Sequence, residues 1–312
     1  MVSSTIEINT AINTKKKHSI SRLKNATTPY VFVLPWLILF LSFTAYPLIL
    51  SFYTSLTDFN PLDPTSINKF VGFTNYLELL KDKNFHTSLL NTLYFTVCTI
   101  PITTILAMLL AVALTQGIKL NTLFQVGFFF PTVTSMSVIS LLWVLLLYKD
   151  GIISRVCILF GLEPRNWLLD KDTALPSIMA MCIWSAIGFY MLIYISALQS
   201  IPKELYEAAI VDGASSWQKF FFVTLPFLRH TTIYVIVLNT INSLQIFSEP
   251  QIMTKGGPAY YSTTAVLYLY RQGFTGHRMG YASAVGYVLF AIILVFALIQ
   301  MKILKLDKGV DD

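Results

Sequence analysis

The chain has 312 residues, of which 55% are hydrophobic and only 12% are charged, and its mean hydropathy is +0.64. A soluble domain carries about 25% charged residues, so this composition excludes an ordinary soluble core and indicates a membrane-spanning protein. The basic residues behind the net charge of +6 lie mainly at the N-terminus and between apolar runs, which is typical of topology determinants and not of a nucleic-acid surface.

The N-terminal residues 1–28 are polar and are expected to form a cytoplasmic tail. The apolar run that follows begins near Tyr30 and is long enough to span a bilayer, whereas a signal peptide has a shorter apolar stretch and a small-residue cleavage site. We therefore expect a retained first helix inside a transmembrane permease domain of residues 29–304, followed by a second cytoplasmic tail, residues 305–312.

Six segments have the length and apolarity of membrane-spanning helices, which predicts an all-α integral membrane bundle. The expected spans are Tyr30–Phe52, Leu89–Leu114, Leu123–Leu147, Leu175–Leu198, Thr231–Phe247 and Tyr281–Met301. None contains Asp, Glu, Lys, Arg or His, whereas ion-coupled carriers usually keep such a group within the membrane. This pattern favours a transporter that receives its energy from another protein.

The even number of spans places both termini on one side of the membrane. Five basic residues precede the first span, which favours a cytoplasmic N-terminus and hence a cytoplasmic C-terminus. These residues are Lys15, Lys16, Lys17, Arg22 and Lys24. The segment 199–230 is then cytoplasmic, and the segments 53–88, 148–174 and 248–280 lie outside.

The segment 199–230 is long for a simple reversal, and its local pattern predicts two short helices around a glycine. Pro202 suits the start of the first helix, with Ser200 as its cap, and Gly213 suits its end. Ser215 and Gln218 fit a capping box at the start of the second helix, and Pro226 is expected to end it. By itself the pattern also fits an amphipathic hairpin on the membrane surface.

The residues of this segment add a more specific signal. An E-A-A triplet is followed by a glycine four residues after its last alanine and then by L-P, and this arrangement resembles the EAA signature of ABC-importer permeases. The matching residues are Glu207, Ala208, Ala209, Asp212, Gly213, Ala214, Leu225 and Pro226. The resemblance implies that they form a coupling element, which docks into a cleft on a separate ATP-binding subunit.

Further segments resemble the sugar-permease branch of this family, which contains maltose, lactose and glycerol-3-phosphate importer subunits. The resemblance covers roughly residues 30–302. The matching segments are Phe70–Tyr76, Asn91–Leu93, Asn166–Leu168, Thr254–Pro258 and Gly280–Ala284. Residue by residue, Gly256, Gly257 and Pro258 also read simply as a tight turn. This chain lacks the extra N-terminal helices and large external domain of the maltose importer's subunit, so that subunit's sugar-contacting residues are not carried over.

The resemblance implies a set of partners in a bacterial or archaeal cytoplasmic membrane. They are a second permease subunit, two ATP-binding-cassette subunits that hold ATP and Mg, an extracytoplasmic solute-binding protein and membrane lipid. The chain itself has no G-x-x-x-x-G-K-[ST] phosphate loop, no metal-ligand spacing and no nucleophile motif. We therefore expect no catalytic residue, metal site or cofactor in this chain, and no nucleic-acid partner.

Polar and aromatic residues in the fourth and fifth predicted spans are candidates for the solute path. Asn239, Asn242 and Ser243 are spaced i, i+3, i+4 and share one helix face, and Tyr190 and Tyr194 are spaced i, i+4. Polar side chains in spans also bond neighbouring helices, and aromatic residues also form interfacial belts. An uncharged lining suits a neutral polar solute.

Two other functions compete with an ATP-driven import permease for a sugar or sugar-like solute. A stand-alone secondary transporter would need an intramembrane charge or an inverted repeat, and the sequence shows neither. A membrane-embedded enzyme would need a cluster of His, Asp or Glu, which the predicted spans do not contain. Oligosaccharides, polyols, glycosylglycerols and glycerol-3-phosphate all remain open as solutes.

Overall fold

The structure is a computed structural model that describes residues 32–305, apart from Pro64, Ile67, Asn68, Ile118, Leu162 and Pro164. Helices and their connections make up this described part, and the residues in it form isolated bridges but no strand. Of the two expected tails, residues 1–28 and 305–312, only the last helical residue, Lys305, lies within it.

Five helical stretches of the described chain are long and apolar enough to cross a membrane. They are Phe32–Ser55, Lys83–Thr115, Met136–Leu159, Ala174–Gln199 and Met279–Gln300. A sixth is counted if Ser216–Phe227 and Arg229–Met253, which meet at a bend of 64°, form one span. The protein is therefore an all-α multi-pass membrane protein.

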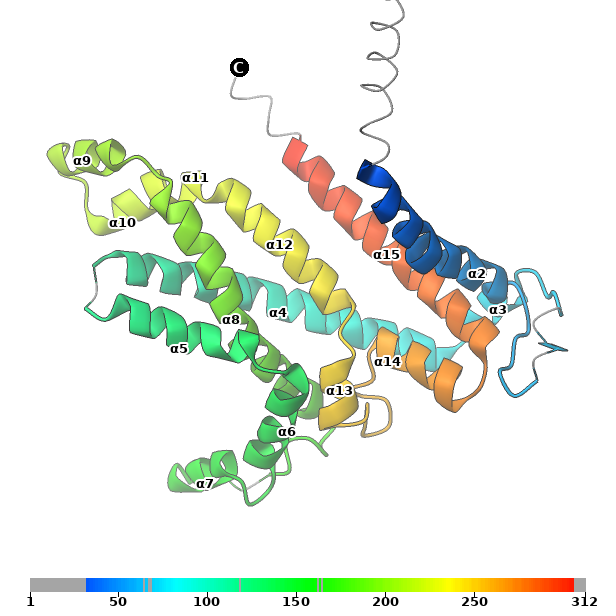
Figure 1. Ribbon diagram of the computed structural model, residues 1–312. Coiled ribbons are helices and arrows are strands. Elements are labelled where there is room, and N and C mark those ends of the chain that lie inside the picture. The colour runs from blue at the N-terminus through cyan, green and yellow to red at the C-terminus, as the bar shows by residue number, and fades with distance from the viewer. Residues whose placement is uncertain are drawn as a thin grey trace, which may run out of the picture.

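Helices α4 (Lys83–Thr115) and α8 (Ala174–Gln199) pack along each other in the centre of the bundle (Figure 1). With 33 residues, α4 is about 50 Å long at 1.5 Å per residue, and it continues through Pro101. Helix α5 (Asn121–Val133) packs closely on α8, because a Cβ at Gly188 would overlap the carbonyl of Phe128. Such close approach at a small residue is typical of helix packing in membranes.

The third predicted span, Leu123–Leu147, is wrong as a single helix. It consists of α5 and α6 (Met136–Leu147), separated by the extended residues Thr134 and Ser135. Pro131 does not itself end α5, because it lies inside the helix, which continues to Val133. Helix α7 (Ile152–Leu159) follows α6, and the membrane-length stretch at this point runs from Met136 to Leu159.

The first span lies on the outside of the bundle, and no residue in its most apolar window is buried. It contains a π-helical stretch, η1 (Leu41–Ala45), and continues as α2 (Tyr46–Ser55), which packs beside α15 (Met279–Lys305) (Figure 1). Its exposed apolar surface is available to lipid and to a partner subunit.

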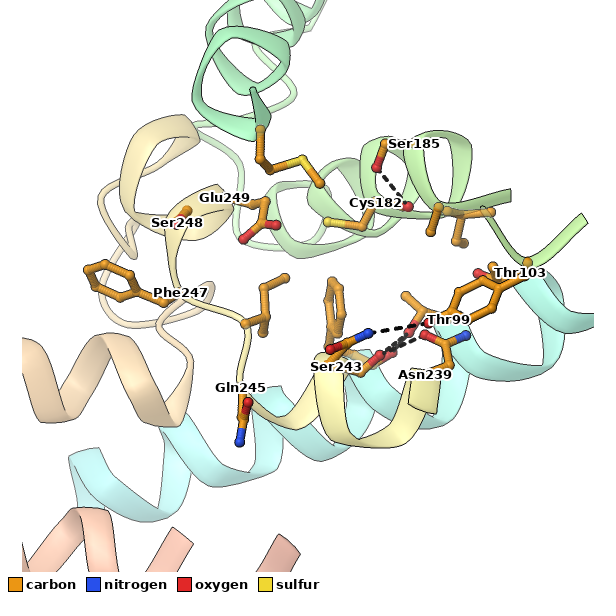
Figure 2. Close-up of a pocket in the computed structure, with 17 residues that line it drawn as sticks. Thr99, Thr103, Cys182, Ser185, Asn239, Ser243, Gln245, Phe247, Ser248 and Glu249 are labelled. Atoms are coloured by element: carbon orange, nitrogen blue, oxygen red, sulfur yellow. Dashed lines mark hydrogen bonds between the residues drawn. The ribbon is translucent and has the colours of Figure 1, made fainter. Parts of the chain in front are cut away.

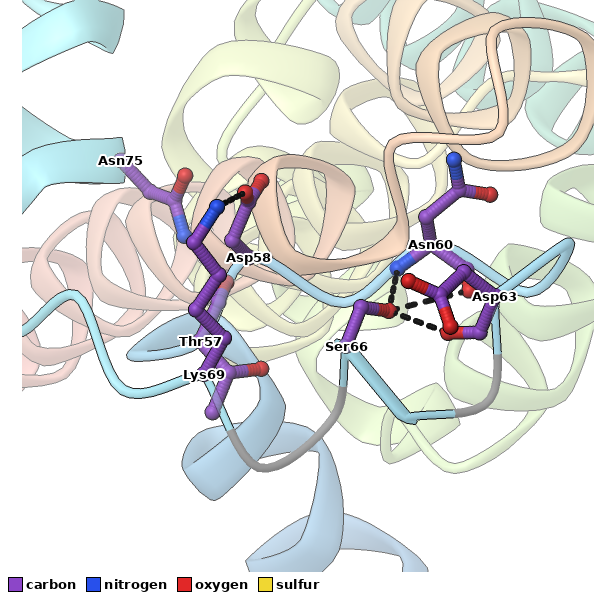
Figure 3. A network of polar contacts seen from close by, with 7 residues as sticks. All are labelled: Thr57, Asp58, Asn60, Asp63, Ser66, Lys69 and Asn75. Atoms are coloured by element: carbon purple, nitrogen blue, oxygen red, sulfur yellow. Dashed lines mark hydrogen bonds and ion pairs between the residues drawn. The ribbon is translucent and has the colours of Figure 1, made fainter.

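The segment Phe70–Tyr76 leads into α3 (Thr74–Leu79) and holds the end of α2. The Asn75 amide donates to the carbonyls of Ser55 and Thr57, both at 2.9 Å. Figure 3 shows the surrounding loop, in which Lys69 pairs with Asp58 at 2.9 Å and other polar contacts link Asn60, Asp63 and Ser66. This motif is therefore a structural clamp.

The remaining helices form a loop, a broken span and the connection to α15. The loop contains α9 (Lys203–Val211), α10 (Ser216–Lys219), the π-helical η3 (Phe220–Thr224) and α11 (Leu225–Phe227). The fifth span begins as α12 (Arg229–Leu244), loses helical structure at residues 245–247 and resumes as α13 (Ser248–Met253). After α13 come α14 (Ala265–Tyr270) and the π-helical η4 (Arg271–Thr275).

Candidate functional site

The helix–glycine–helix loop forms as its sequence predicts. Helix α9 ends at Val211, and Gly213 follows with a φ of +76°, a left-handed conformation in which a side chain would be strained. The predicted capping box at α10 is confirmed. Ser215 Oγ accepts from the Gln218 N–H at 3.3 Å, and Gln218 Oε1 accepts from the Ser215 N–H at 2.7 Å. The corner is therefore fixed by local chemistry at both of its ends.

Two details of the predicted loop are wrong. Ser200 does not cap α9, because its hydroxyl donates back to the carbonyl of Ala197 at 2.7 Å at the end of α8. Pro226 does not end the second helix, which continues through α11 to Phe227. The π-helical turn Phe220–Thr224 precedes this proline, and its wider hydrogen-bond spacing accommodates the donor that proline lacks.

The tip of the loop exposes apolar side chains. No residue of α9 or α10 is buried, and Val211 and Trp217 are 86% and 72% exposed. Of the signature residues, Glu207, Ala208, Asp212, Gly213 and Pro226 are exposed, and Ala209, Ala214 and Leu225 are half-buried. A rigid element with an exposed apolar tip is typical of a surface that binds another protein.

The base of the loop, in contrast, is attached firmly to the bundle. The Tyr206 hydroxyl and Thr224 Oγ1 are hydrogen-bonded at 2.9 Å, which links α9 to η3. Leu228, at the bend before α12, is fully buried in one cluster with Ala111 of α4 and Tyr194 of α8. The base of the loop is therefore in direct contact with α4, α8 and α12.

A cavity of about 420 Å³ lies beside the break in the fifth span (Figure 2). Residues of α4, α6, α8 and α12 line it, together with the consecutive residues 245–249 at the break. This volume falls within the range of small-molecule sites. Non-helical backbone at membrane depth is tolerated where it lines a cavity, and broken helices build the solute sites of many transporters.

Four of the five predicted path residues line this cavity: Asn239, Asn242, Ser243 and Tyr190. Their mutual contacts are long, since Ser243 Oγ lies 3.3 Å from Asn239 Oδ1, and Asn242 Nδ2 lies 3.5 Å from the Tyr190 hydroxyl. Asn239 Nδ2 is buried and has no hydrogen-bond partner in the described chain. The long contacts and the unpartnered Asn239 amide leave hydrogen-bonding capacity at this wall of the cavity.

Tyr194 is not among the lining residues. It is fully buried between α4, α8 and α12, in the same cluster as Leu228. The sequence analysis in turn missed Thr99 and Thr103 of α4, which line the cavity. A signal for both was present, because threonines recur at positions 92, 96, 99 and 103, along one face of the second predicted span.

Glu249 is the most consequential residue that the sequence analysis missed. It lies two residues beyond the predicted end of the fifth span, but the helical stretch Arg229–Met253 includes it and it lines the cavity. The predicted end of the fifth span, at Phe247, therefore stops short of an ionisable residue at the cavity. The reason is the break at residues 245–247, which resembles the end of a span in the sequence although helical structure resumes as α13.

A second polar cluster lies at the N-terminal end of α4, where Asp82 caps the helix by accepting from the Asn84 N–H at 2.9 Å. The other Asp82 carboxylate oxygen accepts from the hydroxyls of Tyr268, on α14, and Tyr281, on α15. Burial raises the pKa of the Asp82 carboxyl, but the hydrogen bonds from both tyrosines and from the backbone outweigh it, and the pKa lies below its usual value. This Asp82 cluster thus joins three helices.

Comparisons with known proteins identify the family. Residues 80–305 match the family model described as the inner membrane component of binding-protein-dependent transport systems. The chain belongs to this family. The permease is 34% identical over 285 residues to the arabinooligosaccharides transport system permease of Bacillus subtilis, with 90% of both chains covered.

Two further comparisons agree with this assignment. The permease is 32% identical to the lactose transport system permease of Rhizobium radiobacter, over 87% of this chain and 92% of the relative. It also superimposes on a chain of a bacterial alginate ABC transporter, solved in complex with a periplasmic protein bound to an alginate pentasaccharide. That comparison gives a TM-score of 0.79 at 25% identity and covers 90% of this chain and 94% of the other.

Proposed function

We propose that this permease and a second permease subunit form the path by which an ATP-driven importer brings a sugar or sugar-like solute into the cell. Two ATP-binding subunits, which hold ATP and Mg, drive the complex, and an extracytoplasmic binding protein delivers the solute. Two relatives described above are permeases for arabinooligosaccharides and lactose, which supports a sugar as the solute.

The observation that carries this proposal is the contrast within the loop between its exposed tip and its anchored base. Val211 and Trp217 are exposed apolar side chains that suit a partner surface. The resemblance of the loop to the EAA signature supports the ATP-binding subunit as that partner. Gly213 lets the chain turn between α9 and the capped helix α10, so that the loop moves as a unit. A long flexible loop would absorb the same displacement.

Few contacts separate the loop from the cavity. A push on α9 and α10 reaches the base of α12 through the Tyr206–Thr224 hydrogen bond and the buried Leu228. Helix α12 carries Asn239 and Ser243 at the cavity. Closure of the ATP-binding subunits would thus reshape the cavity wall, with Asn239, Asn242, Ser243 and Tyr190 as its solute-binding residues.

The proposed orientation has both termini and the coupling loop in the cytoplasm. The five basic residues before the first span support it. In this orientation the Asp82 cluster lies at the outer side, at the opposite end of α4 from Thr115. The binding protein would then dock on the face that contains α3, α7 and α13.

Glu249 gives the alternative of a secondary transporter more weight than the sequence alone does, because a lone carboxylate in a cavity suits proton coupling. Family membership supports the ATP-driven function instead. Uptake in the presence of a protonophore separates the two, since an ATP-driven importer continues to work without a proton gradient.

The decisive experiment is to purify the tagged chain from native membranes in mild detergent, identify its partners and reconstitute the complex. We expect a second six-span permease, an ATP-binding subunit and ATP hydrolysis that the loaded binding protein stimulates. Recovery of the chain alone, with uptake that needs no ATP, would overturn the proposal.

A further inference from the structure

Among the described residues that line the cavity, Glu249 alone has a carboxyl group. The other polar groups there are neutral amides and hydroxyls, and no Lys, Arg or His lines the cavity. Figure 2 shows the Glu249 side chain directed into the cavity on the side of Cys182. Within the described chain its carboxylate has no ion pair and no hydrogen bond to another side chain.

An unpaired carboxylate within a membrane bundle is costly, because desolvation is not offset by a counter-charge. Such groups commonly mark solute or ion pathways. The position of Glu249 is well defined, because Pro250, the next residue, accepts from the Gly256 N–H at 3.2 Å. The turn after α13 is in turn held by Thr263, whose hydroxyl donates to the Gly256 carbonyl at 2.7 Å. The backbone that carries Glu249 is thus fixed at the cavity wall.

The chemistry of a carboxylate restricts what can bind beside it. It only accepts hydrogen bonds, so its partner must donate, and a sugar offers several hydroxyl donors. Asn239 also lines the cavity, and its amide nitrogen, which has no hydrogen-bond partner in the described chain, can donate to the ring or hydroxyl oxygens of the same sugar. A solute that carries its own carboxylate would meet like charge in a site of low dielectric.

We propose that Glu249 is a specificity-determining residue, which accepts hydrogen bonds from the hydroxyls of a neutral saccharide and excludes saccharides that carry a carboxylate. The inference rests on the proposed import function and narrows its solute class. The fold itself does not exclude acids, because a transporter of the same fold imports alginate, an acidic polysaccharide. The discrimination must therefore come from the side chains of the cavity.

The test uses matched sugars that differ by one carboxylate: lactose with lactobionate, and maltose with maltobionate. Binding to the complete complex in nanodiscs, without the binding protein, is measured by saturation-transfer difference NMR, so that the selectivity of the binding protein does not enter. We expect the wild-type complex to bind the neutral member of a pair at least about tenfold more tightly than the acid.

Glu249→Gln keeps the shape of the side chain and removes its charge, so we expect acid binding to approach neutral binding. Glu249→Asp retains the charge and should retain the exclusion. Glu163→Gln is the matched control and should bind like the wild type, because Glu163 is exposed and does not line the cavity. Equal binding of both members by the wild type, or an unchanged preference in Glu249→Gln, would overturn the proposal.

A separate readout distinguishes this failure from failure of the import function. If no neutral sugar contacts the wild-type complex, Glu249 is not a sugar-binding residue and the inference is wrong. Stimulation of ATP hydrolysis by the loaded binding protein in the same preparation would still support the importer. Loss of that stimulation in the wild type would instead remove the proposed function.

Discussion

The two ends of the fifth span are built in opposite ways. Before α12, helices α9 and α10 have no buried residue and expose apolar side chains at the tip. After α13, the connection to α14 is polar yet buried, and Ser262, Thr263 and Thr264 are fully inaccessible. The first end needs a partner to cover it, whereas the second satisfies its own polar groups. Under the proposed function, the first end would transmit force and the second would hold the solute site in shape.

Of the substitutions considered, Gly213→Pro should have the largest effect on the end of the fifth span that carries the loop. Proline fixes φ near −65°, whereas Gly213 has a φ of +76°, so the corner between α9 and α10 cannot keep its form. We expect ATP-driven uptake to fall about tenfold or more, which corresponds to at least about 1.4 kcal/mol of lost coupling. Uptake into proteoliposomes measures this effect.

Gly161→Pro provides the control, because Gly161 also has a φ of +76° and no atom crowds it. It lies in the connection after α7, outside the coupling loop. If both variants lost uptake equally, the loss would reflect general backbone strain and the coupling role of Gly213 would be wrong.

Trp217→Ala should separate association from folding. Trp217 is 72% exposed and stacks on Phe221. Its loss should therefore change the free energy of unfolding of the isolated chain by less than about 0.5 kcal/mol. Buried tryptophans at interfaces commonly contribute about 2 kcal/mol or more to binding. We expect binding to the ATP-binding subunit to weaken about 30-fold, measured by biolayer interferometry. Unchanged affinity would place the partner surface elsewhere.

The sequence predicts the loop well because its determinants are local. Gly213, Ser215 and Gln218 specify the corner and the cap through contacts within four residues. The break in the third span is not predicted, because the apolar run continues on both sides of Thr134 and Ser135. The helix through Pro226 is not predicted, because it depends on whether a proline ends a helix or is accommodated in it. Proline has the same missing donor in both cases, and the surrounding packing decides the outcome.

The cavity is predicted in part for a similar reason. The face of Asn239, Asn242 and Ser243 follows from helical periodicity, and the structure places all three at the cavity. Tyr194 shares a periodic face with Tyr190 but is buried against α4, which only the packing of α4 on α8 determines. Glu249 requires knowledge that helical structure resumes after residue 247, and hydropathy alone does not provide it.

Asp82→Ala tests a region of the molecule that, like the connection after α13, satisfies its own polar groups. The variant loses a helix cap and leaves two tyrosine hydroxyls without their charged acceptor, so we expect about 3 kcal/mol of destabilisation. Thermal unfolding in detergent should show it. Asp58→Ala is the matched control, because Asp58 pairs with Lys69 in full exposure and should leave stability unchanged.

The Asp82 contribution should also depend on pH with a definite sign. Its folded pKa lies below the ordinary value of 3.8, so its stabilisation is complete above that value and is lost as the pH falls through the lower, folded pKa. The stability difference between wild type and Asp82→Asn should therefore be constant near neutral pH and shrink below about pH 4. A difference that grew on acidification would contradict the assigned hydrogen bonds.

Tyr206→Phe should have the smallest effect and locates the boundary between the two ends. The variant removes one hydrogen bond, from the Tyr206 hydroxyl to Thr224, while the ring and the exposed tip remain. The lost hydrogen bond contributes about 1 kcal/mol. If all of this free energy supports coupling, the ratio of uptake to ATP hydrolysis should fall about fivefold. Tyr234→Phe, at an exposed tyrosine of α12, is the control and should leave this ratio unchanged.

Because the tip is intact, affinity for the ATP-binding subunit should be the same in both variants. A fall in affinity instead of coupling would make Tyr206 part of the docking surface, and the anchored base of the loop would then begin at Leu228.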